Sequence, residues 1–110
     1  MAKKSGLDLR QVVDVISAGA GGSWQLANLG PKIAIGDYAP GFMVDLLLKD
    51  LAIVMDAARV HKLPVSAAAL SEGYFRAASA AGEGVSGTHA VAKTVEKLGC
   101  FNYSVDQETS

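Results

Sequence analysis

A lysine in the middle of a long apolar segment is the residue best suited to chemistry in this sequence. Residues 41–55 are almost continuously apolar, and Lys49 is the only cation among them. At 100° per residue, a helix gathers four charged side chains into one narrow stripe: Asp45, Lys49, Asp56 and Arg59. An ammonium group in such a stripe indicates a cleft for an anionic ligand. The alternative is a surface pair between Lys49 and Asp45, four residues apart.

A corner of small residues, Gly19-Ala-Gly-Gly-Ser23, offers a second candidate site. It is not a dinucleotide-binding glycine loop, because Ser23-Trp24 stands where the third glycine belongs and a helix precedes it. One interpretation is a helix end followed by Ser23 as the cap of the next helix. The other is that free N–H groups at Ser23 and Trp24 hold a carboxylate. Gln25 and Asn28 either face the same cleft or are solvated, and Trp24 is expected to anchor the core.

The composition excludes several classes of function. The 110 residues are 50% hydrophobic and 19% charged with a net charge of −1, which excludes disorder and gives no sign of nucleic-acid binding. His61 and His89 lack a partner one helical turn away, so we expect no metal site. The single Cys100 is expected to act as a small hydrophobic residue, which suits the cytoplasm. No targeting or membrane-spanning segment is recognisable.

Helical periodicity runs through almost the whole sequence, and no segment alternates as a strand does. Asp8 is predicted to cap a first helix. Ser23 is predicted to cap a second, which ends near Leu29 because Gly30-Pro31 follows. We further predict a turn at residues 32–35, a loop at 36–41 and a long central helix at 42–61. A helix over 64–81 with Pro64 in its first turn follows, then a flexible corner at 82–87 and a last helix from Thr88. We expect an all-α domain of about five helices, with its core at residues 5–99 and a polar tail at 102–110.

Apolar positions predict which helix faces are buried. The expected inward residues of the first helix are Val12, Val13 and Ile16, and those of the last helix are Val91, Val95 and Leu98. In the helix over 64–81 they are Ala67, Leu70, Tyr74, Ala77 and Ala81. The central helix is apolar over more than half its circumference, so we expect it to be surrounded. A chain this short cannot provide that cover alone, which predicts a homodimer or a missing lobe.

Several of these segments together resemble the C-terminal helical domain of the β-hydroxyacid dehydrogenases, the family of 3-hydroxyisobutyrate dehydrogenase and tartronate semialdehyde reductase. The resemblance covers roughly residues 5–99, and its most specific part is the spacing from Gly-Phe to Lys-Asp-Leu. The matching segments are Gly21-Gly-Ser-Trp-Gln-Leu-Ala-Asn28, Pro40-Gly-Phe-Met43, Leu48-Lys-Asp-Leu51, Leu63-Pro64 and Gly87-Thr-His-Ala90. The resemblance implies a fold like the C-terminal domain of 6-phosphogluconate dehydrogenase.

The same resemblance implies roles for individual residues. In that family an NAD(P)-binding Rossmann domain and a linker helix with the catalytic lysine come first, so we expect both to be absent and this chain to hold no catalytic residue. Lys49 is implied to bind the cofactor, and Gly22, Ser23 and Asn28 the substrate. The implied cofactor is NAD or NADP, which we expect not to bind this chain alone, and the implied substrate is a small β-hydroxy acid.

These expectations describe the substrate-pocket and dimerisation domain of an NAD(P)-dependent oxidoreductase, inactive by itself and completed by a Rossmann domain or partner lobe. The alternative is a stand-alone helical oligomerisation or interaction module without catalysis. The two interpretations differ in Lys49, which carries a ligand in the first and is an ordinary surface residue in the second.

Overall fold

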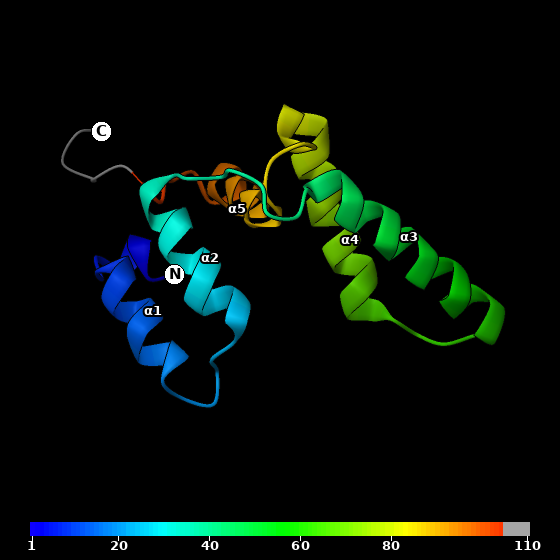
Figure 1. Cartoon of the computed structure of the whole chain (residues 1–110), viewed down its shortest axis with the longest axis horizontal. Helices are drawn as coiled ribbons and strands as arrows, with labels where there is room; N and C mark the ends of the chain where they lie inside the picture. The colour runs from blue at the N-terminus through cyan, green and yellow to red at the C-terminus, as the bar shows by residue number, and fades with distance from the viewer. Residues whose placement is uncertain (105–110) are drawn as a thin grey trace. The chain divides into compact units, whose positions relative to one another are not determined.

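The computed structural model describes residues 1–104, and every regular element in that range is a helix (Figure 1). The five α-helices are α1 (Leu9–Ser17), α2 (Trp24–Ile35), α3 (Val44–His61), α4 (Ser66–Ala78) and α5 (Val91–Gly99). Three short helical turns are Lys3–Ser5, the π-helical Ser79–Glu83 and Thr88–Ala90. The prediction of an all-α domain with about five helices is confirmed. Part of the predicted tail, residues 105–110, lies outside the described residues.

The chain forms two compact units, one of Met1–Tyr38 with Val95–Ser110 and the other of Ala39–Thr94. Each unit is held together by its own helices, and α5 contributes residues to both. Within residues 1–104, none of the helices is both long and apolar enough to span a membrane.

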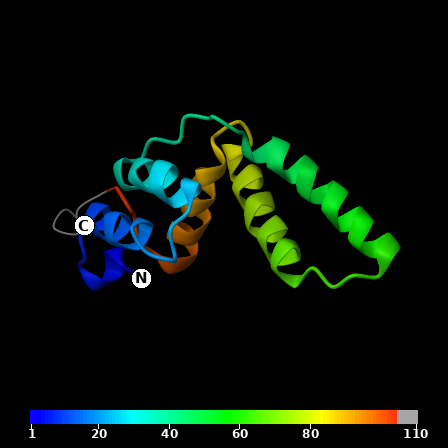
Figure 2. The same ribbon diagram turned by 60° about the horizontal axis from the view of Figure 1, so that its bottom comes forward.

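In the first unit, α1 and α2 lie side by side as a helical hairpin (Figures 1 and 2). Asp8 begins α1, where its carboxylate accepts a hydrogen bond of 2.9 Å from the Gln11 backbone N–H. Ser23 begins α2 in the same way, with its hydroxyl oxygen 3.0 Å from the Leu26 nitrogen. Both predicted caps are therefore confirmed, because such caps depend only on residues within one turn.

The predicted break at Gly30-Pro31 is wrong, because α2 continues through Pro31 to Ile35. An internal proline removes one helical hydrogen bond and crowds the preceding turn, a cost of about 3 kcal/mol or more. Packing against α1 offsets that cost. The contact is close at Gly30, where an added Cβ would lie 3.0 Å from a methyl group of Val13. Tertiary packing of this kind supplies most of the stability of a protein helix.

In the second unit, α3 and α4 are consecutive helices of a hairpin, joined by a turn at residues 62–65 (Figure 2). The predicted long helix over 42–61 is confirmed, with its start two residues later than expected. Pro64 precedes α4 by two residues, so its predicted place in the first turn is wrong.

The start of α3 is bound to the corner that follows α4. The backbone N–H of Val44 donates to the Ser86 carbonyl at 3.0 Å, and that of Asp45 donates to the Gly84 carbonyl at 2.9 Å. An isolated antiparallel bridge joins the same corner to the residue before α3. Met43 offers no side-chain cap, so the corner takes over the first free N–H groups of the helix. The corner therefore has a structural role that the prediction of a flexible segment did not include.

The buried face of α4 is not the predicted one. All five expected residues are exposed, with Leu70 at 67%, whereas Ala78 is buried and Phe75 is half-buried. The exposed set is Ala67, Leu70, Tyr74, Ala77 and Ala81. Both faces of this helix are apolar, and periodicity cannot tell which of two such faces the chain itself covers.

The other predicted inward residues are also less buried than expected. Ile16, Val95 and Leu98 are exposed, and Val12, Val13 and Val91 are half-buried. The described chain does not itself surround the central helix, since Ile53 is 60% exposed, and cover by a second copy or another lobe stays a prediction. Among residues 1–104 the buried hydrophobic side chains are small: Val44, Ala58, Ala78, Ala90 and Ala92.

Both α2 and α3 end on a residue in the left-handed conformation. Gly36 closes α2 with a φ of 74°, and Lys62 closes α3 with a φ of 53°. At the second end the Leu63 N–H donates to the Ala58 carbonyl at 2.9 Å, the hydrogen bond of a Schellman motif. Glycine adopts this conformation freely, whereas a lysine Cβ is crowded there.

We predict that Lys62→Gly stabilises the protein by about 0.5–1 kcal/mol. The left-handed conformation costs a residue with a Cβ about 1–2 kcal/mol, and the greater chain entropy of unfolded glycine returns about half of that. The free energy of unfolding in urea measures the difference. The matched control is Gly36→Ala, which should lower stability because it adds a Cβ at the equivalent helix end. A loss of stability in Lys62→Gly would contradict the prediction.

Candidate functional site

Lys49 is exposed on α3 and makes no hydrogen bond or ion pair with any residue from 1 to 104. The acidic side chains of its stripe are engaged elsewhere. Asp45 accepts a hydrogen bond of 2.6 Å from the Ser79 hydroxyl, and Asp56 pairs with Arg59 at 3.0 Å. The surface pair between Lys49 and Asp45 is therefore wrong for this structure.

Magnitudes explain why Asp45 prefers Ser79 to Lys49. A hydrogen bond to a charged group contributes about 1.5–3 kcal/mol before solvent exposure is discounted, whereas an exposed pair at i,i+4 contributes about 0.3–0.5 kcal/mol. Asp45 also lies in the first turn of α3, where the helix dipole favours a negative charge. The result is a lysine without a counter-charge among residues 1–104, which suits a phosphate or carboxylate ligand.

Ser23 combines a structural role with a possible ligand role. Its hydroxyl oxygen caps α2 by accepting from Leu26, which still leaves its O–H able to donate. The backbone N–H groups of Trp24 and Gln25 have no acceptor among residues 1–104. The start of α2 therefore presents donors that a carboxylate fits.

Gly22 and Asn28 have local structural reasons for their identities. An added Cβ on Gly22 would lie 2.5 Å from the backbone oxygen of Ser17, so a side chain does not fit there. The Asn28 amide donates to the Trp24 carbonyl at 2.8 Å, one helical turn back. Trp24 is 70% exposed, so the prediction that its ring anchors the core is wrong for the described chain. Lys49 belongs to the second unit and this corner to the first.

A carboxylate in the corner after α4 escaped the sequence-based prediction. Glu83 accepts hydrogen bonds from the Lys93 ammonium at 2.7 Å and from the Ser86 hydroxyl at 2.6 Å. The Lys93 hydrogen bond and then that of Ser86 hold the pKa of Glu83 below its ordinary value, against the opposing effect of burial. Lys93 is ten residues away, a spacing that no local motif would reveal.

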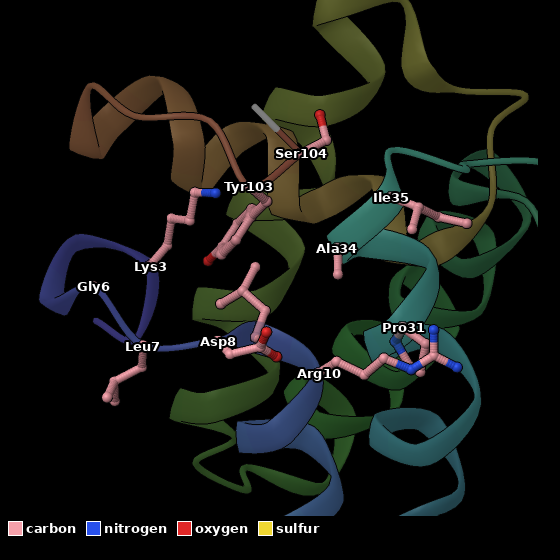
Figure 3. Close-up of a pocket in the computed structure, with 11 residues that line it drawn as sticks. Lys3, Gly6, Leu7, Asp8, Arg10, Pro31, Ala34, Ile35, Tyr103 and Ser104 are labelled. Atoms are coloured by element: carbon pink, nitrogen blue, oxygen red, sulfur yellow. The ribbon is translucent and has the colours of Figure 1, made fainter. Parts of the chain in front are cut away.

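A pocket of about 500 Å³ in the first unit was also not foreseen (Figure 3). Its walls come from three separate segments, which include Asp8, Arg10, Pro31 and Tyr103. Burial raises the pKa of the Tyr103 phenol, and the charge of Glu96 raises it further. No group of three His, Cys, Asp or Glu side chains that could hold a metal ion occurs in the described range.

The known proteins to which this chain is similar include several oxidoreductases. An uncharacterized oxidoreductase of Synechocystis is 47% identical over 64 residues, which cover 58% of this chain and 22% of that protein. The L-threonate dehydrogenase of Cupriavidus necator is 41% identical over 90 residues, covering 82% of this chain and 30% of the enzyme. A probable mitochondrial 3-hydroxyisobutyrate dehydrogenase-like protein of Arabidopsis thaliana is 35% identical over 109 residues, which cover 99% of this chain and 32% of that protein.

The family follows from the length of the match. Residues 1–95 match the family described as "NAD-binding of NADP-dependent 3-hydroxyisobutyrate dehydrogenase", and the chain belongs to this family. A crystal structure of 3-hydroxyisobutyrate dehydrogenase from Salmonella typhimurium superimposes with a TM-score of 0.79 at 36% identity, covering 84% of this chain and 32% of that one. The chain thus spans about a third or less of these relatives. The resemblance to the β-hydroxyacid dehydrogenases is confirmed at the level of the family.

We predict that acid destabilises the corner after α4, because Glu83 becomes protonated. Because the pKa of Glu83 is lowered on folding, its contribution is complete above its ordinary value of 4.5 and is lost as the pH falls through the folded-state pKa. Glu83→Gln removes this dependence. In urea unfolding at a series of pH values, the free energy of unfolding of the wild type should exceed that of Glu83→Gln by an amount that grows as the pH rises to 4.5 and is constant above it. Parallel pH profiles for the two proteins would contradict the assignment.

Proposed function

We propose that this chain is the C-terminal helical domain of an NAD(P)-dependent dehydrogenase that acts on a small β-hydroxy acid. The observation that carries the proposal is the exposed Lys49, which has no counter-charge among residues 1–104, in a family described as NAD-binding. The length of the relatives supports assigning the rest of the cofactor site to a Rossmann domain. The fold would then be that of the 6-phosphogluconate dehydrogenase C-terminal domain. The free Cys100 fits a reducing compartment such as the cytoplasm.

In this proposal the candidate residues bind two anions. Lys49 holds an anionic group of the dinucleotide, since an ammonium without a partner in the described part of the chain fits a phosphate oxygen. Ser23 and the free N–H groups at the start of α2 hold the substrate carboxylate, with Gly22 allowing close approach and Asn28 bracing the first turn. The nicotinamide supplies or accepts the hydride.

We also propose a homodimer. The exposed side of α4 repeats apolar residues at helical spacing, and Ile53 and Leu70 are well exposed on neighbouring helices. Apolar surface of this kind marks a protein–protein contact, and a second copy is the simplest partner because most soluble oligomers are symmetric.

A hybrid enzyme tests the role of Lys49. This chain replaces the matching segment of the Cupriavidus necator L-threonate dehydrogenase, and Lys49→Ala is then introduced. We expect KM for the dinucleotide to rise about tenfold or more with a smaller change in kcat, because a charged hydrogen bond to the bound cofactor is lost. The 110-residue chain alone should oxidise no β-hydroxy acid.

The matched control is Arg59→Ala, another exposed cation on α3, which should leave KM unchanged. An unchanged KM in the Lys49 variant would favour the interaction module without catalysis. Sustained turnover by the chain alone would refute the proposed dependence on a second lobe.

Sedimentation velocity tests the proposed dimer. We expect wild-type protein to sediment as a dimer and Leu70→Lys to sediment as a monomer, since a buried charge in the contact is costly. The control is Ser71→Lys on the neighbouring exposed position of α4, which should remain dimeric. A monomeric wild type, or a dimeric Leu70→Lys variant, would contradict this contact.

A further inference from the structure

We propose that Ser79 and Gly84 form a clamp that holds the Asp45 carboxylate away from Lys49 and so keeps the lysine open to its anionic ligand. The inference rests on the proposed function for the identity of that ligand. It makes Asp45, Ser79 and Gly84 positioning residues, which act through Lys49.

The first arm of the clamp is a hydrogen bond. The Ser79 hydroxyl donates to Oδ1 of Asp45 at 2.6 Å, across 34 residues of sequence. Ser79 lies at the first position of the π-helical turn after α4, so that turn carries the hydroxyl to the start of α3.

The second arm is the absence of a side chain at Gly84. A Cβ there would overlap the Asp45 carboxylate, lying 2.7 Å from its Cγ. The carboxylate therefore rests against the bare backbone of Gly84, whose carbonyl also accepts the Asp45 N–H at 2.9 Å. Gly84 has a φ of −58° and a ψ of −34°, which alanine adopts equally well. A glycine suits position 84 because it leaves room for the carboxylate, and not because of its conformational freedom.

Without the clamp, Asp45 has a ready alternative partner. An acid placed four residues before a lysine on a helix is in the favourable order for an ion pair. Lys49 is exposed and makes no interaction within residues 1–104 that would compete. A released Asp45 would pair with it and oppose the binding of an anion at the ammonium group.

The chemical reactivity of Lys49 tests the clamp directly in the 110-residue chain. Lysines are acetylated with trace acetic anhydride, and the rate at Lys49 is measured by mass spectrometry relative to the exposed Lys97. We expect Ser79→Ala and Gly84→Ala each to lower the Lys49 rate about twofold, because an exposed i,i+4 pair then protects the amine. Gly84→Ala displaces the carboxylate while Ser79 is retained, because the added methyl group clashes with the movable Asp45 side chain.

Two further variants separate the clamp from a loss of structure. Ser79→Thr retains the hydroxyl and should keep the wild-type rate, and Asp45→Asn should restore that rate in the Ser79→Ala background. Unchanged reactivity in both clamp variants, or a decrease that Asp45→Asn does not reverse, would overturn the inference. In the hybrid enzyme, Ser79→Ala should raise KM for the dinucleotide about twofold at constant kcat. If the reactivity changes as expected and KM does not, the clamp stands and the role of Lys49 in cofactor binding fails.

Discussion

The setting of α3 depends on the backbone hydrogen bonds between its first turn and the corner that follows α4. Val44 and Asp45 donate to carbonyls of this corner at 3.0 and 2.9 Å, and Val44 is the largest fully buried side chain of the described chain. These bonds replace the missing side-chain cap and fix how the helix is rotated. Since Lys49 lies only one turn further on, its direction follows from the same contact. Glu83 also stabilises this corner, through its hydrogen bonds with Lys93 and Ser86.

The buried core is made mostly of alanine, and larger apolar side chains such as Ile53 and Leu70 remain exposed. A small alanine core contributes little hydrophobic stabilisation, at roughly 25 cal/mol per Å² of apolar surface removed from water. Exposed apolar faces on neighbouring helices are expected if other protein covers them in the working molecule. The relatives, about three times as long as this chain, are consistent with such cover.

The success of the sequence-based predictions followed the range of the interactions involved. Asp8 and Ser23 were recognised as caps because capping depends on the next three residues. The break at Pro31 was predicted from local preference and failed because packing against α1 outweighs it. Leu70 was placed inward because a period of 3.6 residues identifies an apolar face without saying what meets it. The Asp45–Ser79 contact joins residues 34 apart, so the freedom of Lys49 could be suspected from the sequence but its cause could not.

The central claim is that Lys49 meets an anionic group of the bound cofactor. The most direct measurement is a crystal structure of a longer protein that carries this segment, with the nicotinamide dinucleotide bound. The account predicts that the Lys49 ammonium lies within ion-pair distance of a cofactor oxygen while Asp45 stays on Ser79. A bound dinucleotide with Lys49 left in solvent, or paired with Asp45, would contradict it.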